Sequence, residues 1–314
     1  MSTTTVPTAT HVIRDFPELR RHAQLLGPRR IAVVMADDDI ALTAAGRALQ
    51  LGVAVPVLVG NEESIRSTAR KLDLSALLAR AEFVAAATEN AATAAVAIAH
   101  EGRVDALLKG HLRTDELLHA VLDKQAGLRT GRLLSDVMLY EDRREPGSRL
   151  VGITDGGLNV LPDLAQKKQI VQNAIEVMHR LGIERPKIAI MSATEAVSDS
   201  VPSSVDAKLL TEMGEAGEFG EAEVFGPLAL DGALVESAAR AKGIKHPVAG
   251  QADCMVVPNI EAGNLLGKAA KYLAGSQCAH VVVGAKVPIL IPSRVESIDD
   301  KVNSIALGVI FAAH

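Results

Sequence analysis

The sequence is poor in aromatic residues and in cysteine, and both shortages narrow what the protein can be. Only 2% of its 314 residues are aromatic and none is Trp, whereas 48% are hydrophobic, so the core must be built from Ala, Val, Leu and Ile. This composition suits parallel strands covered by helices. The two cysteines, Cys254 and Cys278, form no CxxC pair, which predicts reduced, buried thiols in place of a disulfide framework or a metal site.

The sequence also gives no sign of a nucleic-acid partner or of contact with a membrane. The net charge is −5 and no Lys/Arg-rich run is present, so nucleic acid is not an expected partner. No apolar stretch is long enough to cross a bilayer, and residues 1–10 have neither the basic start nor the apolar segment of a signal peptide. We therefore expect a cytoplasmic protein without membrane contact, in which residues 1–10 are a disordered leader.

Signatures of the common cofactor and metal sites are missing. GxGxxG, HExxH and GxSxG do not occur, and the nine histidines are scattered without ligand spacing. Residues 263–268 resemble a phosphate loop, but three residues separate the glycines where four are required, and Ala269 replaces the hydroxyl that binds Mg²⁺. The segment follows a helical pattern, which favours helix packing. We expect no metal site and no permanently bound cofactor.

Short apolar runs alternate with longer segments of helical period, which is the pattern of β-α-β units. The polar segment 141–149 contains a Pro-Gly pair and is the best candidate for a domain boundary. The sequence predicts an α/β protein with mixed or parallel sheets and two domains separated by a ligand cleft. The runs predicted as strands begin at residues 31, 53, 82, 104, 133, 150, 187, 254 and 280; the predicted helices cover 40–51, 62–72, 90–100, 115–122, 163–181, 203–213, 262–273 and 297–313.

Lys109 and Thr114 flank a predicted strand–loop–helix connection. The helix N-terminus offers unpaired N–H groups to an anion, although a simple connection capped by Thr114 is the alternative. Five arginines follow in residues 129–149. Three of them alternate with acidic residues and predict a solvated charged face, whereas Arg129 and Arg132 have no acid nearer than Asp136 and are the better anion contacts.

Two further loops follow predicted strands. In Thr154-Asp155-Gly156-Gly157-Leu158-Asn159 the glycines permit close approach of the backbone to a ligand, and a tight turn formed by Asp155 and Asn159 is the alternative. Near the end of the chain, Ser293 and Arg294 precede a helix that Ser297 is suited to cap. A hydroxyl, a guanidinium and a helix N-terminus make an anion site. The spacing from Ser297 to Asp300 also matches a capping box, which would give Asp300 a structural role.

These blocks, in this order, resemble the phosphate acetyltransferase and phosphate butyryltransferase family. The matching segments include DALLKGHLRTDELLHAVL, GLRTGRLLSDV, ITDGGLNVLPDL, PVAGQADCMVVPNIEAGNLLGKAAKYLAG and VVVGAKVPILIPSR. The resemblance implies a fold related to isocitrate and isopropylmalate dehydrogenases, and a homodimer. It also implies that residues 1–148 and 291–314 form one domain and 149–290 the other. The implied reaction converts acyl-CoA and phosphate into acyl phosphate and coenzyme A, without a metal.

The resemblance also assigns roles to residues. The Ser-Arg pair and an Asp seven residues beyond the Ser line the acyl-phosphate site of the acetyltransferases; here they fall on Ser293, Arg294 and Asp300. Ser293 and Asp300 are then the expected catalytic residues, although Asp299 beside Asp300 leaves the choice of general base open. The expected substrate contacts are Arg294, Lys109, Thr114, Arg129, Arg132, Ser135, Asp155, Asn159 and Asn259.

The expected substrates are phosphate and a short acyl-CoA, with acetyl ahead of butyryl. A dehydrogenase of the same fold would need a nicotinamide pocket and an Asp cluster for Mg²⁺, and the sequence has neither signature. A two-lobed solute-binding protein would share the alternation of strands and helices, but would carry a signal peptide.

Overall fold

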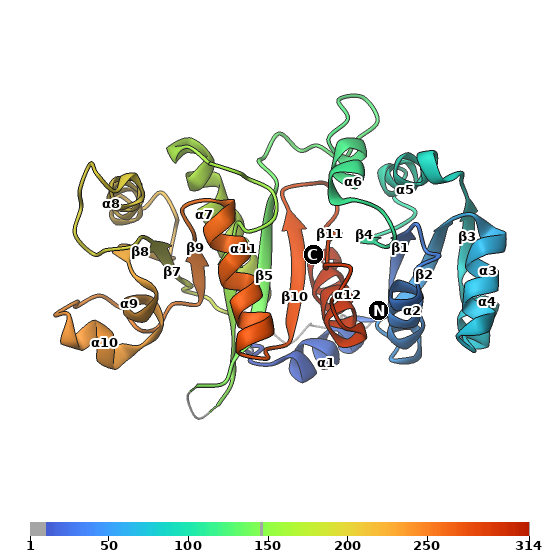
Figure 1. The fold of residues 1–314 in the computed structure, drawn as a ribbon, viewed down its shortest axis with the longest axis horizontal. Coiled ribbons are helices and arrows are strands. Elements are labelled where there is room, and N and C mark those ends of the chain that lie inside the picture. Colours follow the sequence, from blue (N-terminus) through green and yellow to red (C-terminus); the bar gives the residue numbers. More distant parts are fainter. Residues whose placement is uncertain (1–10, 145–146, 314) are drawn as a thin grey trace, which may run out of the picture.

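A computed structural model describes residues 11–144 and 147–313, so the leader expected over 1–10 lies outside the described residues. The described chain forms one sheet of eleven strands with helices on both faces (Figure 1). The strands are β1 (Arg29–Val34), β2 (Ala54–Gly60), β3 (Glu82–Ala85), β4 (Ala106–Lys109), β5 (Ser135–Asp142), β6 (Arg149–Thr154), β7 (Lys187–Met191), β8 (Glu223–Leu228), β9 (Cys254–Val256), β10 (Cys278–Val283) and β11 (Ile289–Leu290).

The helices connect these strands in the expected alternation. They are α1 (Phe16–Leu26), α2 (Asp39–Gln50), α3 (Glu62–Lys71), α4 (Ser75–Arg80), α5 (Ala91–His100), α6 (Thr114–Val121), α7 (Leu164–Arg180), α8 (Pro202–Glu215), α9 (Leu230–Leu234), α10 (Glu236–Ala241), α11 (Ile260–Lys268) and α12 (Ile298–Ala312). A 3₁₀ turn, η1 (Thr88–Asn90), precedes α5, and a π-helical turn, η2 (Ala269–Leu273), extends α11. Among the described residues, no helix combines the length and apolar character needed to span a bilayer.

The strand order is β3-β2-β1-β4-β11-β10-β5-β6-β9-β7-β8. Pairing is parallel at both ends of the sheet, but β10 is antiparallel to both β11 and β5, and β5 is antiparallel to β6. The strands on the two sides of this centre therefore run in opposite directions. The predicted α/β class with a mixed sheet is confirmed.

Side chains that alternate along the strands form cores on the two faces of the sheet. One large cluster joins the strands to α1–α4, α7, α8 and α12. On the opposite face, α5 and α6 pack on the half that contains β1 and β4, whereas α9 and α11 pack on the half that contains β6 and β9. The second face therefore carries two separate helix groups, with the centre of the sheet between them.

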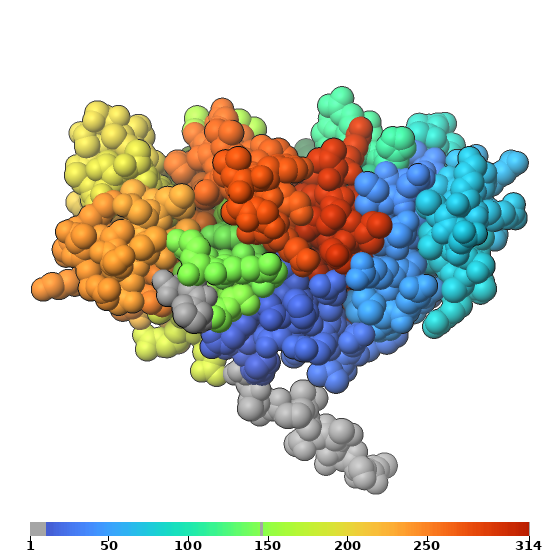
Figure 2. All heavy atoms as spheres, turned by 60° about the horizontal axis from the view of Figure 1, so that its bottom comes forward, coloured from blue at the N-terminus to red at the C-terminus, as the bar shows by residue number. Residues whose placement is uncertain are grey.

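The last helix packs beside the first one. α12 contacts α1, α2 and the central strand β10, and Figure 2 shows the C-terminal residues in red next to the N-terminal residues in blue. The division into domains at 148 and 290 stays a prediction. One hydrogen-bonded sheet continues across both proposed boundaries, since β5 pairs with β6 and β10 pairs with β11.

Two differences from the expected elements have local causes. The run from His280 to Ile291 was predicted as continuous strand, but it turns at Gly284, which has φ +99 and lies against the carbonyl of Leu133. The helix α1 was not predicted, although Asp15 caps it and Phe16 and Leu19 bury one face at helical spacing. The strand β8 was also missed.

Two glycines fix the distance between α11 and the loop after β6. A Cβ on Gly263 would lie 2.7 Å from the Cα of Gly156, and one on Gly156 would lie 2.8 Å from the carbonyl carbon of Gly263. Neither residue has positive φ, so the requirement is close backbone approach. The interpretation of 263–268 as a packed helix is confirmed.

This contact predicts different costs for two alanine substitutions in the same helix. Gly263→Ala must push α11 away from rigid backbone, and we expect it to lower the free energy of unfolding by about 1–3 kcal/mol. Gly267→Ala is the matched control, because its Cβ would meet the flexible Met138 Sδ at 2.7 Å and alanine favours helix. Urea unfolding of both variants checks this. Equal stability of the two variants would contradict the backbone contact.

Candidate active site

A cavity of about 540 Å³ lies on the second face, between α6 and α11 and above the centre of the sheet. The register of the strands brings its floor together. His280 pairs with Met138 across β10 and β5, and Met138 pairs with Ile153 of β6. Lys109 ends β4 on the other side of β11. The cavity thus lies where strand direction reverses, as expected for a ligand crevice in an open α/β sheet.

Cationic side chains surround the cavity. Lys109, Lys268, Lys271 and Arg294 all line it. Lys109 is 4% exposed, and its burial, together with the nearby charges of Lys301 and Arg294, lowers its pKa to about 8. Arg294 is exposed and pairs with no acidic side chain among the described residues. An anion can therefore enter without displacing an ion pair of Arg294.

The loop between β11 and α12 holds Ser293 and Arg294 at the cavity. The carbonyl of Ser293 accepts hydrogen bonds from the Glu296 amide at 3.2 Å and from Lys301 Nζ at 3.1 Å. These contacts fix the backbone of Ser293 beside the cavity. A positioned hydroxyl beside a guanidinium is suited to stabilise an oxyanion next to a bound anion.

Asp300 lies behind this loop and does not line the cavity. It completes a capping box with Ser297, whose amide donates to Asp300 Oδ2 at 3.0 Å, and it accepts from the Cys278 amide at 2.9 Å. Its carboxylate also forms an ion pair with Lys271. Burial would raise the pKa of Asp300, but donors from Lys271, Ser297 and Cys278 outweigh it and lower the pKa. The predicted capping box is confirmed, whereas the predicted catalytic role remains untested.

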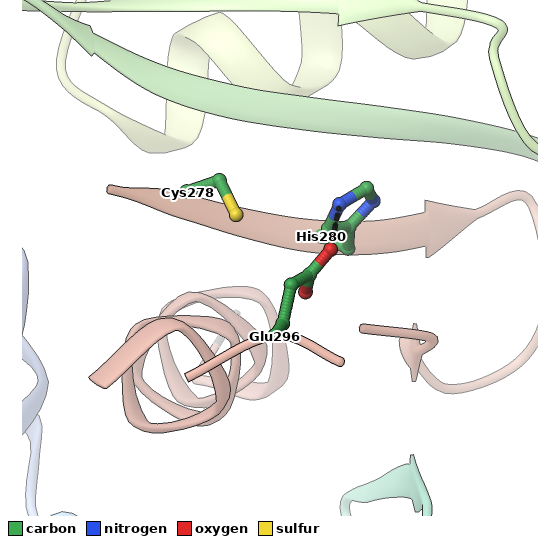
Figure 3. Close-up of side chains that lie close together, drawn as sticks. All are labelled: Cys278, His280 and Glu296. Atoms are coloured by element: carbon green, nitrogen blue, oxygen red, sulfur yellow. Dashed lines mark ion pairs between the residues drawn. The ribbon is translucent and has the colours of Figure 1, made fainter. Parts of the chain in front are cut away.

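A buried histidine between two carboxylates forms part of the cavity wall. His280 Nδ1 lies 3.3 Å from Asp136 Oδ2, and Nε2 lies 3.3 Å from Glu296 Oε1. Burial would lower the pKa of His280, but the charge of Asp136 and hydrogen bonds with Asp136, Cys278 and Glu296 raise it well above the usual value. Figure 3 shows Glu296 reaching from the segment before α12 toward the ring on β10.

Cys278 lies near the same ring. Within the described part of the chain, Cys278, His280 and Glu296 offer possible metal-ligand atoms within 4.8 Å of one another. Both imidazole nitrogens already face carboxylates, and burial raises the pKa of the Cys278 thiol. We interpret the group as an ion-paired imidazolium and assign no metal to it.

The other expected substrate contacts lie at different distances from the cavity. Thr114 lines it at the start of α6. Asp155 and Asn159 organise the turn after β6: Asp155 Oδ1 accepts from the amides of Gly157 and Leu158, and Asn159 Nδ2 donates to Asp155 Oδ2 at 2.6 Å. The Gly157 position is itself tight, since a Cβ there would lie 2.8 Å from Asp136.

Four more expected contacts make internal or peripheral interactions. Ser135 is buried and accepts from Asn173 at 2.8 Å, and Asn259 caps α11. Arg132 pairs with Glu176 at 2.7 Å. Arg129 and Arg132 line a second hollow of about 320 Å³ beside α6, together with Asn159. Their substrate contacts stay predictions. The other three arginines pair with Glu141 and Asp142, as the alternating charges indicated.

Sequence reasoning missed His280, Glu296 and Asp136 as members of the site. Asp136 lies within one matching segment, whereas His280 and Glu296 lie just outside the last one. A single His in an apolar strand carries no local signal of a functional role. Their meeting depends on the pairing of β10 with β5 and on the turn that returns Glu296 to β10. Lys268 and Lys271 were missed for a similar reason, because they line the cavity only after α11 packs on the loop after β6.

Comparisons with known proteins agree with the resemblance. The sequence model described as "Phosphate acetyl/butaryl transferase" matches residues 78–309. A phosphate acetyltransferase from Rhizobium meliloti is 41% identical over 88% of this chain and 86% of its own, and a phosphate butyryltransferase from Clostridium acetobutylicum is 37% identical over 96% and 100%. The crystal structure of a branched-chain phosphotransacylase from Enterococcus faecalis superimposes with a TM-score of 0.77 at 29% identity, covering 91% of this chain and 99% of that one.

The position of Asp300 predicts a pH-dependent loss of stability in Asp300→Asn. Asn can cap the helix but cannot neutralise Lys271, whose side chain is 18% exposed. We expect a loss of about 3 kcal/mol at neutral pH, the low end for breaking a buried ion pair. Because the pKa of Asp300 is lowered on folding, its contribution is complete above about pH 4 and is lost as the pH falls through the folded pKa.

Asp299→Asn is the control. Asp299 is 37% exposed and pairs with Arg47 at 2.7 Å, so its loss should cost less than about 1 kcal/mol. Urea unfolding of wild type and both variants from pH 7 to pH 3 measures the difference. A loss in Asp300→Asn that does not shrink at low pH would contradict the ion pair.

Proposed function

The chain belongs to the phosphate acetyl- and butyryltransferase family, and from this premise we propose which residues of its cavity perform the reaction and which acyl group it takes. The protein is an acyltransferase that exchanges an acyl group between coenzyme A and phosphate. The observation that carries the residue assignments is the position of Ser293, Arg294 and Lys109 around one cavity.

We place phosphate between Arg294 and Lys109. Phosphate carries one to two negative charges near neutral pH, and a guanidinium can hold two of its oxygens at once. Lys109 adds a buried positive charge whose pKa of about 8 leaves it mostly protonated at neutral pH. A bound dianion would stabilise that charge further. The first turn of α6, beginning at Thr114, offers its free N–H groups on the same side.

Ser293 is proposed to stabilise the oxyanion that forms when phosphate attacks the acyl carbonyl. Ser293 and Arg294 are neighbours in the chain and line the same cavity, so both can act on the same tetrahedral intermediate. Asp300 is the general base proposed from the resemblance. It touches Lys271, which lines the cavity, and any action on substrate would have to pass through that contact or through movement of the loop.

Acetyl-CoA is the proposed substrate, and butyryl-CoA is the second candidate. The acetyltransferase relative is 41% identical and the butyryltransferase relative 37%, which favours acetyl. The apolar side chains in the cavity, Leu112, Met138, Ile153 and Ile291, favour the longer chain. Each added methylene is worth about 1–3 kcal/mol in an apolar pocket. A comparison of kcat/KM for acetyl-, propionyl-, butyryl- and isobutyryl-CoA decides between the two substrates. A clear preference for butyryl-CoA would reverse the proposal.

The remaining expectations belong to the same proposal. Arg129, Arg132, Ser135, Asp155, Asn159 and Asn259 are proposed to contact coenzyme A or to shape the loops that do. We also propose a cytoplasmic homodimer. Leu265, Tyr272 and Leu273 along α11 and η2 are exposed apolar residues suited to an interface. Sedimentation of the 33.0 kDa chain tests the homodimer, and a monomer at micromolar concentration would contradict it.

Release of free thiol from acetyl-CoA should depend on phosphate and should survive EDTA. The resemblance implies a reaction without a metal, and the cavity supplies its positive charge from side chains. Thiol release is followed with a disulfide reagent, with and without phosphate, EDTA and added Mg²⁺. Activity that disappears on chelation and returns with Mg²⁺ would contradict this assignment, and thiol release without phosphate would indicate a thioesterase.

Arg294→Ala should raise KM for phosphate about 10- to 100-fold, with a smaller change in KM for acyl-CoA. A charge-assisted contact of about 1.5–3 kcal/mol corresponds to that range. Arg143→Ala is the control, since Arg143 pairs with Glu141 outside the cavity. If KM for phosphate and acyl-CoA rose together in Arg294→Ala, the side chain would be holding the loop and not the phosphate.

A further inference from the structure

Acyl transfer to phosphate also moves a proton. Hydrogen phosphate brings a proton into the reaction, whereas acyl phosphate leaves as a dianion at neutral pH and coenzyme A leaves as a thiol. One proton must therefore pass from a phosphate oxygen to the sulfur. A base near the phosphate and an acid near the sulfur are both needed, and general acid–base catalysis of this kind typically contributes about 10²–10⁴-fold in rate.

Glu296 and His280 offer a base and an acid in contact with each other. Both line the cavity that Ser293 and Arg294 share. Nε2 of His280 lies 3.3 Å from Oε1 of Glu296, and the two side chains are only 14% and 7% exposed. The second oxygen of Glu296, Oε2, is buried and has no hydrogen-bond partner among the described residues. A buried acceptor without a partner is costly. A turn of the Glu296 side chain that brings Oε2 to the surface of the cavity would let a ligand pair with it.

Asp136 fixes the imidazole from the other side. Its two oxygens each lie 3.3 Å from Nδ1 of His280, and it is 3% exposed. A carboxylate at Nδ1 orients the ring and places the exchangeable proton on Nε2. Asp136 is held in turn by the loop after β6, since its amide donates to Asp155 Oδ2 at 3.2 Å.

We propose that Glu296 and His280 are the acid–base pair of the acyl transfer, with Asp136 as the positioning residue for the imidazole. The proposal rests on the acyl transfer proposed above and assigns the role of general base to Glu296 in place of Asp300. The pair begins as carboxylate and imidazolium. Glu296 Oε2 accepts the proton of hydrogen phosphate as a phosphate oxygen attacks the acyl carbon. The C–S bond then breaks, its electron pair goes to sulfur, and His280 donates its Nε2 proton to that sulfur.

The pair then returns to its starting state without solvent. After the step Glu296 is a neutral acid with its proton on Oε2, and His280 is a neutral imidazole. The carboxyl group then turns so that its protonated oxygen takes the place of Oε1, which lies 3.3 Å from Nε2 in this structure, and the proton passes to His280. The direction of this proton transfer follows from the pKa values of the two side chains. Although burial alone would raise the pKa of Glu296, His280 lowers it, and the carboxylates hold the pKa of His280 well above the usual value. The reverse reaction uses the same groups in the opposite order.

The charges around the pair come from every element packed against it. Asp136 on β5 and Glu296 in the loop face the ring directly, and Cys278 lies beside it on β10. Asp155 follows β6 and acts through Asp136. Lys271 of η2 and the α12 residues Asp300 and Lys301 act through Glu296. Unlike Glu296, Asp300 already has Lys271, Ser297 and the Cys278 amide as partners, and it lies outside the cavity.

Three substitutions test the pair in the full-length protein, with pH profiles of kcat and KM measured in both directions. Glu296→Gln and His280→Gln should each lower kcat about 10²–10⁴-fold with little change in KM for acyl-CoA. Asp136→Asn keeps the imidazole but removes a negative neighbour, so the loss of activity at high pH should begin at lower pH than in wild type. His246→Gln is the matched control, because His246 stacks on Phe225 away from the cavity.

The outcomes separate this pair from its alternatives. Near wild-type kcat in Glu296→Gln or His280→Gln, or an unchanged alkaline limb in Asp136→Asn, would overturn the pair while leaving the proposed function intact. Asp300→Asn measured beside them would overturn it if that variant alone lost kcat. Stoichiometric zinc in the purified protein, with activity lost on chelation, would show that the cluster is a metal site instead. A wild-type protein without phosphate-dependent thiol release would remove both proposals.

The test still works if a variant does not fold. Circular dichroism and thermal melting establish which variants are native. If His280→Gln does not fold, NMR titration of the wild-type ring and of the ring in Asp136→Asn replaces it. The ring of the wild type should titrate well above the usual range for His, and that of Asp136→Asn at lower pH. A wild-type ring that titrates at the ordinary value would overturn the pair.

Discussion

Antiparallel pairing at the centre of the sheet organises this protein. β10 is antiparallel to β11 and to β5, and β5 is antiparallel to β6, so the parallel strands on the two sides run in opposite directions. Because of it, the end of β4, the loop after β11 and the turn after β6 all reach the same region of one face. The helices on that face stay apart, with α5 and α6 on one half and α9 and α11 on the other. The cavity is the space that this arrangement leaves at the centre of the sheet.

The electrostatics of the cavity follow from where the chain places its charges. The protein carries a net charge of −5, yet Lys109, Lys268, Lys271 and Arg294 converge on one cavity. Focusing of this kind lets an acidic protein attract a phosphate and the anionic part of coenzyme A. Three carboxylates in or behind the wall of the cavity are buried and paired: Asp136 and Glu296 with His280, and Asp300 with Lys271. Attraction of the anion and handling of a proton can therefore occur side by side.

The features that could be predicted from the sequence were those that depend on short stretches of chain. Apolar runs gave most strands, and the S-x-x-D spacing gave the capping box of α12, because both depend on neighbours within a few residues. The run from His280 to Ile291 was predicted as a single strand, since the turn at Gly284 is imposed by packing against Leu133. For the site, three of the residues chosen from the sequence, Ser293, Arg294 and Lys109, line one cavity, but the sequence could not show that Asp300 would be buried against Lys271.

The amino-acid sequence by itself determined the α/β class, the family and the loops that we propose to bind the anion, because periodicity and contiguous motifs carry that information. The tertiary structure alone decided which charges meet. Asp136, His280 and Glu296 are separated by up to 160 positions, and their contact depends on the pairing of β10 with β5 and on the return of the chain before α12. Burial by that packing turns three ordinary side chains into a coupled ion-paired group, since low dielectric strengthens each of their interactions.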